Sequence, residues 1–349
     1  MHPSTPYLRV DIARLDANIT QVADAARLAG RDLRPHAKTH KTVQIAQRQL
    51  QAGAAGLTVA TLGEAEVFAD AGVTDLFLAL PIWPDANRAA RLRALADRVS
   101  LRLAVDSVEG ARHLASCLDG APASILIEVD SGQHRTGVDP THVAAIAEAA
   151  REAGLDVIGA FTFPGHSYSP DATASAATDE SRALAEAGRQ LRGAGIEPVV
   201  LSGGSTPSLE ASLASPGATT ELRPGVYVFG DAQQWELGRT TPDRIALTCR
   251  ATVISHAGGR MILDSGSKAL GADRAPYAQG FGRLLEDPAA RIVQLSEHHA
   301  VVQTERSHPL GTVVDVVPNH VCNAVNLTEV LYVDDGHALE AWPVAARGC

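Results

Sequence analysis

Short apolar runs alternate with amphipathic segments over the first two-thirds of the chain. Between most of the runs lie segments rich in Ala, Arg and Glu whose apolar positions recur at helical spacing, and several of these segments end in Gly. The alternation predicts repeated strand–helix units and therefore a parallel sheet. The runs with the length and composition of strands are LRPHAK (33–38), GLTVAT (56–61), DLFLAL (75–80), LRLAVDS (101–107), SILIEVD (124–130), DVIGAFTF (156–163), PVVLSGG (198–204) and ELRPGV (221–226).

Strand–helix units repeated this often predict a (β/α)8 TIM barrel, whose active site lies at the C-terminal ends of the strands. The alternative is a doubly wound open sheet. It is less favoured because the first strand–helix turn lacks the G-x-G-x-x-G pattern.

The pattern changes after about Trp235. The segments 244–267 and 312–346 have the pattern of strands and turns with little helix, which predicts a second, mostly β domain. The opening PYLRVDIARLDANI begins with a short strand that can join it. The predicted domains are therefore a barrel at 15–235 and a β domain made of 1–14 with 236–349.

Composition narrows the functional class. The chain has 349 residues, of which 45% are hydrophobic and 20% charged, and its net charge of −10 argues against nucleic acid or an acidic membrane surface as partner. Aromatic residues make up 4%, too few for a base-stacking platform. There is no apolar run of membrane-spanning length and no secretory signal pattern, and the four cysteines are scattered. We expect a cytoplasmic protein with reduced thiols.

The basic residues show an unusual bias. Of 30 basic residues only three are lysines, and two of these, Lys38 and Lys41, lie together in RPHAKTHKT. Arginine can replace lysine as a surface charge but not as a nucleophilic amine, because guanidinium does not deprotonate. Lys38 and Lys41 are therefore candidate nucleophiles. The alternative is that both are solvated loop charges.

Several polar groups fall at the C-terminal ends of the predicted strands, which a barrel would gather on one rim. Each of them alone is as easily an ordinary loop residue. They are Lys38, Arg135, His166, Tyr168, the stretch SGGSTPS (202–208), Arg223 and Tyr227.

The stretch SGGSTPS follows the seventh predicted strand. Its glycines allow close backbone approach, and its amides and hydroxyls can hold an anion, as phosphate sites in TIM barrels do. The alternative is a flexible turn, and the stretch is not a Walker A motif because the lysine is missing. A reactive lysine together with a phosphate cradle suggests pyridoxal phosphate.

The chain resembles the fold-type-III pyridoxal-phosphate enzymes, the alanine-racemase-like barrels, and within them the branch of the D-threonine aldolases and D-serine dehydratases. The similarity spans nearly the whole chain in the family's order. It is carried by the stretches RPHAKTHK, VDSGQHRTGV, TFPGHSY, SGGSTP, ELRPGVYVFGD, DSGSK and PNHVC.

This resemblance implies a set of cofactor contacts. Lys38 would carry the cofactor and Lys41 would not. Arg135 would lie near the phenolic oxygen and Tyr168 near the ring, and Arg223 matches the arginine that pairs with the pyridine nitrogen in alanine racemases. The phosphate would be bound by Gly204, Ser205 and Thr206, with help from Tyr227.

His320 and Cys322 are two residues apart and would share one face of a strand. An imidazole and a thiolate suit Zn²⁺, although two ligands do not make a site and a His beside a buried Cys is the commoner case. The resemblance implies a divalent metal here, Zn²⁺ or Mn²⁺, with cysteine favouring zinc. His299 matches a further histidine of the family and is a candidate catalytic residue, whereas the neighbouring His298 is as easily solvated.

The implied activity is that of a lyase acting on D-β-hydroxy-α-amino acids. Retro-aldol cleavage to glycine and an aldehyde, as in D-threonine aldolase, is placed first on resemblance. The alternative is dehydration to a 2-oxo acid and ammonia, towards which Cys322 inclines. An amino-acid racemase and a cofactor carrier are less favoured, because racemases lack the His-x-Cys pair and carriers lack the second domain. The resemblance also implies a homodimer.

Overall fold

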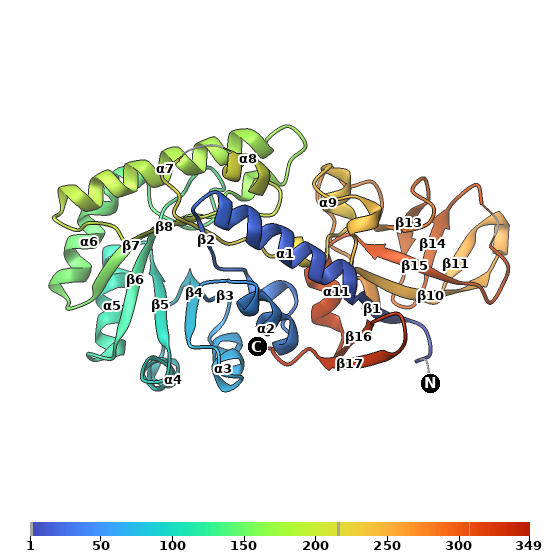
Figure 1. Ribbon diagram of the computed structural model, residues 1–349, viewed down its shortest axis with the longest axis horizontal. Helices are drawn as coiled ribbons and strands as arrows, with labels where there is room; N and C mark the ends of the chain where they lie inside the picture. The colour runs from blue at the N-terminus through green and yellow to red at the C-terminus, as the bar shows by residue number, and fades with distance from the viewer. Residues whose placement is uncertain (1–2, 215–216, 307) are drawn as a thin grey trace. The chain divides into compact units, whose positions relative to one another are not determined.

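The structure is a computed structural model that describes residues 3–214, 217–306 and 308–349. It divides into two compact units (Figure 1). The barrel unit comprises Val22–Lys38, Gln49–Gly225 and Cys349, and the β unit comprises Met1–Gln21, Thr39–Arg48 and Val226–Gly348. The domain boundaries drawn from the sequence stay a prediction.

The barrel unit is built on one parallel sheet. Among the described residues this sheet has eight strands in the order β2-β9-β8-β7-β6-β5-β4-β3, and a parallel bridge between His36 and Thr58 joins the two ends of the order. The predicted TIM-like barrel is confirmed, and every predicted run overlaps one strand. The strands are β2 (Asp32–Leu33), β3 (Leu57–Val59), β4 (Asp75–Pro81), β5 (Ser100–Val105), β6 (Ala123–Glu128), β7 (Asp156–Phe161), β8 (Val200–Gly203) and β9 (Glu221–Leu222).

Strands β2 and β9 are shorter than the sequence predicted. Pro35 and Pro224 follow them closely, and a proline has no N–H to donate to a ladder. The chain stays extended beyond β2, since the His36 N–H donates to the Pro224 carbonyl at 3.0 Å. The prediction that Lys38 ends the first strand is wrong, because Lys38 lies in a 3₁₀ turn, η1 (Ala37–Thr39).

Helices follow the barrel strands, and N-cap residues in the sequence mark where several of them begin. The side chains of Thr61, Asp85 and Ser107 cap the first turns of α3, α4 and α5. Among the residues described, no helix is both long and apolar enough to cross a membrane. The helices of this unit are α3 (Leu62–Asp70), α4 (Ala86–Ala96), α5 (Val108–Leu118), α6 (Val143–Glu152), α7 (Thr173–Gly193) and α8 (Leu209–Ala214).

The interior of the barrel combines an aromatic pair with a charged network. The rings of Phe77 and Phe161 meet edge to face with centroids 4.9 Å apart. The fully buried guanidinium of Arg34 donates to Asp75 at 2.7 and 2.9 Å and to Glu221 at 2.7 Å. Arg102 also donates to Glu221, at 3.0 Å. These bonds satisfy charges that burial would otherwise make very costly.

The β unit contains a sheet with the path β13-β14-β11-β10-β1-β16-β17, and β15 pairs with β10 and β12. Strand β1 is antiparallel to β10 and parallel to β16, so the opening strand does join the β-rich unit. The strands are β1 (Tyr7–Asp11), β10 (Leu247–Ser255), β11 (Met261–Leu263), β12 (Gly282–Leu284), β13 (Arg291–Leu295), β14 (Ala300–Gln303), β15 (Val313–Pro318), β16 (Val330–Asp334) and β17 (Leu339–Pro343).

The β unit also contains short helices, including one where the sequence predicted strand and turn. Helix α11 (Val321–Leu327) begins just after β15, and His320 is its N-cap residue. Helices α9 (Ala232–Glu236) and α10 (Ser267–Leu270) lie in the same unit. Helices α1 (Ile12–Leu28) and α2 (Val43–Gln51) each contain residues of both units.

Candidate active site

Three of the predicted cofactor residues gather around one aromatic ring in the barrel unit. The Lys38 Nζ lies 5.6 Å and the Arg135 Cζ 5.3 Å from the centroid of Phe163, and the Tyr168 ring centroid is 6.4 Å from it. These residues come from the segments that follow β2, β6 and β7, so they share the C-terminal rim of the sheet. Phe163 was not singled out from the sequence, although it lies inside TFPGHSY.

The two neighbouring lysines have different environments. Lys38 is half-buried beside Phe163, whereas Lys41 is buried in the β unit, where its Nζ donates to Asn326 Oδ1 at 2.8 Å. Lys41 also has φ of +51°, a left-handed conformation that is uncommon outside glycine. The alternative of a solvated loop charge is therefore wrong for Lys41, which has a structural partner.

The Gly-rich stretch after β8 forms a tight, hydroxyl-lined turn. The Ser205 Oγ lies 2.8 Å from both Ser167 Oγ and Ser208 Oγ, so three hydroxyls meet at one point. Gly204 has φ of +90°, and a Cβ there would stand 3.1 Å from Leu222 Cδ2. The turn thus needs a glycine, and Thr206 follows directly with its carbonyl accepting from the Leu209 amide.

A buried carboxylate lies behind this turn. Glu180, on α7, accepts a hydrogen bond from the Gly204 amide at 2.7 Å, and a Cβ on Gly203 would stand 2.6 Å from its carboxyl carbon. Burial raises the pKa of Glu180 to about 7, against the opposing hydrogen bond from Gly204 and the charge of Arg223. No sequence pattern distinguishes Glu180, because it lies in a polar helical segment.

Arg223 lies inside the barrel rather than on its surface. It donates to Ser202 Oγ at 2.5 Å and to the Thr162 carbonyl at 2.6 Å. Its guanidinium also stacks 5.2 and 5.7 Å from the centroids of Phe161 and Phe77. Burial lowers the pKa of Arg223 from its ordinary value.

Glu128 is another buried acid that sequence reasoning missed. It ends β6 and accepts from Thr136 Oγ1 at 2.9 Å, while its other oxygen is buried with no hydrogen-bond partner among the described residues. Burial raises its pKa, and the hydrogen bond from Thr136 and the charge of Arg135 oppose that rise. An acid at the end of a buried strand run carries no distinctive sequence pattern.

His320 and Cys322 are not on a strand, contrary to the prediction. Asn319 and His320 leave β15, and α11 begins at Val321, so the two side chains come from the start of a helix. Residues two apart do not normally face each other on a helix, but His320 still has extended backbone as N-cap, and its imidazole interacts with the Cys322 thiol. The two side chains interact from a different local structure than predicted, and their role as metal ligands stays a prediction.

Two further contacts define this pair. The His320 Nδ1 lies 2.6 Å from Asp273 Oδ2, and the Cys322 Sγ donates to Thr39 Oγ1 at 3.3 Å. Burial acts to lower the pKa of His320, but the Cys322 charge and the Asp273 hydrogen bond outweigh it and raise that pKa to about 11. Among the described residues, no group of three or more His, Cys, Asp or Glu side chains is arranged to hold a metal.

The remaining predicted residues lie elsewhere in the β unit. Tyr227 is buried in the 3₁₀ turn η4 (Val226–Val228). His299 is exposed in the turn between β13 and β14, where its carbonyl accepts from the Ser296 amide at 2.9 Å. The roles of both residues stay predictions.

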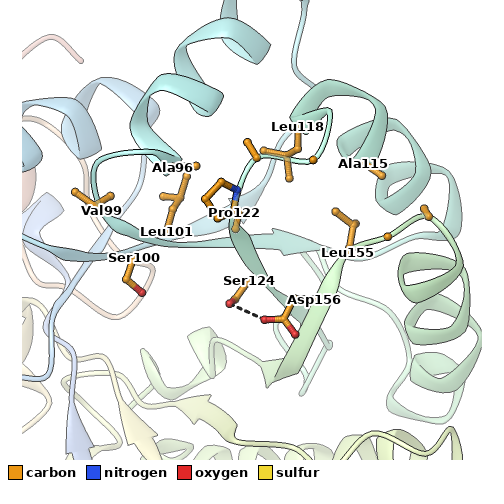
Figure 2. A pocket seen from close by; sticks show the side chains of 15 residues that line it. Ala96, Val99, Ser100, Leu101, Ala115, Leu118, Pro122, Ser124, Leu155 and Asp156 are labelled. Atoms are coloured by element: carbon orange, nitrogen blue, oxygen red, sulfur yellow. Dashed lines mark hydrogen bonds between the residues drawn. The ribbon is translucent and has the colours of Figure 1, made fainter.

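A cavity of about 500 Å³ lies at the opposite end of the barrel strands (Figure 2). It is lined by the first residues of β5, β6 and β7 and by the ends of the helices before them. Ser124 donates to Asp156 at its edge, at 3.0 Å. None of the predicted site residues lines this cavity.

Comparison with known proteins shows the family to which the chain belongs. Residues 10–233 match the family model "Alanine racemase, N-terminal domain", and residues 246–333 match the family model "Putative serine dehydratase domain". The chain is 34% identical to D-threo-3-hydroxyaspartate dehydratase of Delftia sp. (strain HT23), covering 91% of this chain and 90% of the relative. It is 33% identical to D-threonine aldolase of Arthrobacter sp., covering 99% and 93%.

The solved structures agree with the sequence comparison. One match is the metal-free form of a D-threo-3-hydroxyaspartate dehydratase mutant in which a cysteine is changed to alanine. Its TM-score is 0.90 at 31% identity, and the match covers 98% of this chain and 97% of that chain. A mutant of the same enzyme with a histidine changed to alanine matches with a TM-score of 0.89.

Proposed function

Because this chain belongs to the alanine-racemase-like, fold-type-III family of pyridoxal-phosphate enzymes, in the branch of the D-threonine aldolases and D-serine dehydratases, we propose that it is a pyridoxal-phosphate- and divalent-metal-dependent lyase. Its substrates would be D-β-hydroxy-α-amino acids. The relatives from Delftia and Arthrobacter support this class, since one is a dehydratase and the other an aldolase.

The barrel rim fits the cofactor. Lys38 offers an amine beside the Phe163 ring, and Arg135 brings a positive charge to the same ring. The turn at Gly204 and Ser205 offers clustered hydroxyls and a backbone kept bare by glycine, which suits a phosphate group. Thr206 and Tyr227 are proposed as further phosphate contacts from the family resemblance, as Tyr168 is for the ring. When bound, pyridoxal phosphate withdraws electrons from the substrate α-carbon.

The His320–Cys322 pair fits a soft divalent metal such as zinc, because an imidazole and a thiol that already interact are a suitable donor set. Two protein ligands leave coordination positions open, as a catalytic rather than structural site requires. The histidine and the cysteine changed in the two solved dehydratase mutants are also two positions apart in that chain. A metal held there would assist departure of the substrate's β-hydroxyl.

Of the two lyase reactions we favour dehydration over retro-aldol cleavage. The single observation that carries this choice is the His-x-Cys pair, because a histidine and a cysteine with the same spacing were changed in the solved mutants of a dehydratase. From the family resemblance, the Lys38 amine would take the proton from the substrate α-carbon. From the same resemblance, His320 and Cys322 would hold the metal that assists departure of the β-hydroxyl. His299 stays a candidate catalytic residue from the family resemblance alone.

Retro-aldol cleavage remains the second candidate. The Arthrobacter D-threonine aldolase aligns with 99% of this chain, so the sequence similarity does not separate the two reactions. Homodimer formation and cytoplasmic location also stay predictions that the resemblance and the sequence support.

Product analysis tests the proposal. The purified protein with pyridoxal phosphate is treated with a chelator and dialysed. It is then given zinc or manganese and either D-threonine or D-threo-3-hydroxyaspartate, with the L-enantiomers as matched controls. We expect a 2-oxo acid and ammonia from a D-substrate only, with zinc restoring the activity. Glycine and an aldehyde would identify the aldolase. Racemisation that the chelator leaves unchanged would contradict the lyase proposal.

A further inference from the structure

We infer that Asp273 is a positioning residue that fixes the imidazole of His320 so that its Nε2 faces the metal. The inference rests on the proposed metal-dependent lyase function. Asp273 lies in the segment between α10 and β12, remote in sequence from His320, and its Oδ2 is 2.6 Å from the His320 Nδ1. Neither the spacing of the His-x-Cys pair nor the motif PNHVC points to this residue.

The chemistry of imidazole makes such a partner necessary. A neutral histidine has one nitrogen that carries a proton and one that can donate a lone pair, and the hydrogen bond of the first decides which one binds metal. With the Asp273 carboxylate at 2.6 Å, Nδ1 is the nitrogen that keeps its proton and donates it. The Nε2 is then the nitrogen left for a metal, and the same carboxylate holds the plane of the ring.

The segment that carries Asp273 is itself held close to α11. Gly271 has φ of +75°, and a Cβ at this position would stand 3.2 Å from Asn323 Cβ and 3.2 Å from Asp273 Oδ1. Glycine therefore lets the backbone turn tightly and approach the helix that bears Cys322. A bulkier residue at position 271 would push the carboxylate away from the imidazole.

A second carboxylate fixes the backbone at the same place. The fully buried Asp231 caps α9 through the Gln234 amide at 2.8 Å and accepts from the Val321 amide at 3.2 Å. Val321 lies between His320 and Cys322, so Asp231 secures the peptide that joins the pair. Asp273 then restrains the rotation of the imidazole about its side-chain bonds.

Zinc affinity tests this inference without relying on activity. Zinc binding to the pyridoxal-phosphate-loaded protein is measured by competition with a chromophoric chelator for the wild type, Asp273→Ala, Asp273→Asn and Cys322→Ala. The matched control is Asp24→Asn, which removes an exposed carboxylate on α1. We expect Asp273→Ala to weaken zinc binding by about 10- to 100-fold. Asp273→Asn should lose less, because an amide oxygen can still accept from Nδ1, and Asp24→Asn should not change.

Folding and ligand identity are followed in the same samples. The cofactor absorption and the far-ultraviolet circular dichroism of Asp273→Ala should match those of the wild type, because Asp273 lies in a partly exposed loop segment and no core side chain is removed. With saturating cobalt, Asp273→Ala should keep the thiolate-to-cobalt charge-transfer band, which Cys322→Ala should lose.

The outcomes distinguish the role of Asp273 from the proposed metal-dependent function. Zinc binding that is lost in Cys322→Ala but unchanged in Asp273→Ala would overturn the role of Asp273 and leave the proposed metal lyase standing. A wild-type protein that binds no zinc would overturn both.

Discussion

Replacing Glu180 by Gln tests whether the acid behind the Gly-rich turn is held neutral by burial. Glu180 is fully buried on α7 and accepts from the Gly204 amide at 2.7 Å, an interaction that a glutamine oxygen can also make. The substitution therefore removes the ionisable group while keeping the size of the side chain and its hydrogen bond.

The magnitude follows from the pKa. Burial raises the pKa of Glu180 from 4.5 to about 7, a difference of about 2.5 units, or about 3 kcal/mol at about 1.36 kcal/mol per unit. The folded-state pKa lies above the unfolded one, so between these values the folded protein holds a proton that the unfolded chain releases. Stability from this group is complete below pH 4.5 and is lost as the pH rises through about 7.

The assay is thermal unfolding of the cofactor-free protein and of Glu180→Gln from pH 4.5 to pH 8. At the low end the two midpoints should differ by a constant that reflects packing. Towards pH 8 the variant should gain about 6–12 °C relative to the wild type, at roughly 2–4 °C per kcal/mol for a domain of this size. Other titrating groups are common to both proteins and cancel in the difference.

A matched control is Glu152→Gln, which changes an exposed glutamate at the end of α6. Its midpoint should follow the wild type at every pH. If the difference between Glu180→Gln and the wild type did not change with pH, Glu180 would not titrate in this range, and the claim that burial keeps it protonated would be refuted.

Two further predictions concern the lysines and the barrel interior. Lys38→Ala should abolish the absorption of the lysine-bound cofactor, whereas Lys41→Ala should keep it, because Lys41 bonds to Asn326 in the β unit; borohydride reduction with peptide mapping that found the cofactor on Lys41 would contradict this. Arg34→Met should lower the free energy of unfolding in urea by about 3–5 kcal/mol, because it leaves the buried Glu221 carboxylate without its main partner. A loss below about 1 kcal/mol would contradict the inferred importance of the buried network.

The strand–helix order of the barrel could be predicted from the sequence because its strands are short apolar runs, buried on both sides, and capped helices separate them. The caps at Thr61, Asp85 and Ser107 lie just before their helices, so chain-local signals mark them. Prolines limit β2 and β9. The prediction that Lys38 ends a strand is wrong because Pro35, which has no N–H for the ladder, follows β2 before the 3₁₀ turn that contains Lys38.

The residues of the candidate site were predicted better than the local structure around them. Lys38, Arg135 and Tyr168 were found from strand-end position and motif, and the structure brings all three to the ring of Phe163. The local structure at His320 was predicted wrongly, since an apolar run interrupted by Asn319 can continue as strand or start a helix. Periodicity over so few residues does not separate the two.

By itself, the sequence determined which elements form and in what order, because apolar period, caps and turn residues act over a few positions of the chain. It also determined where lysine is retained in an arginine-rich protein. Only the tertiary structure decided that the Glu180 carboxylate accepts from the Gly204 amide and that the Asp273 carboxylate contacts the His320 imidazole. These pairs join residues far apart in the chain, and burial and hydrogen bonding give each group its chemical state only after folding brings them together.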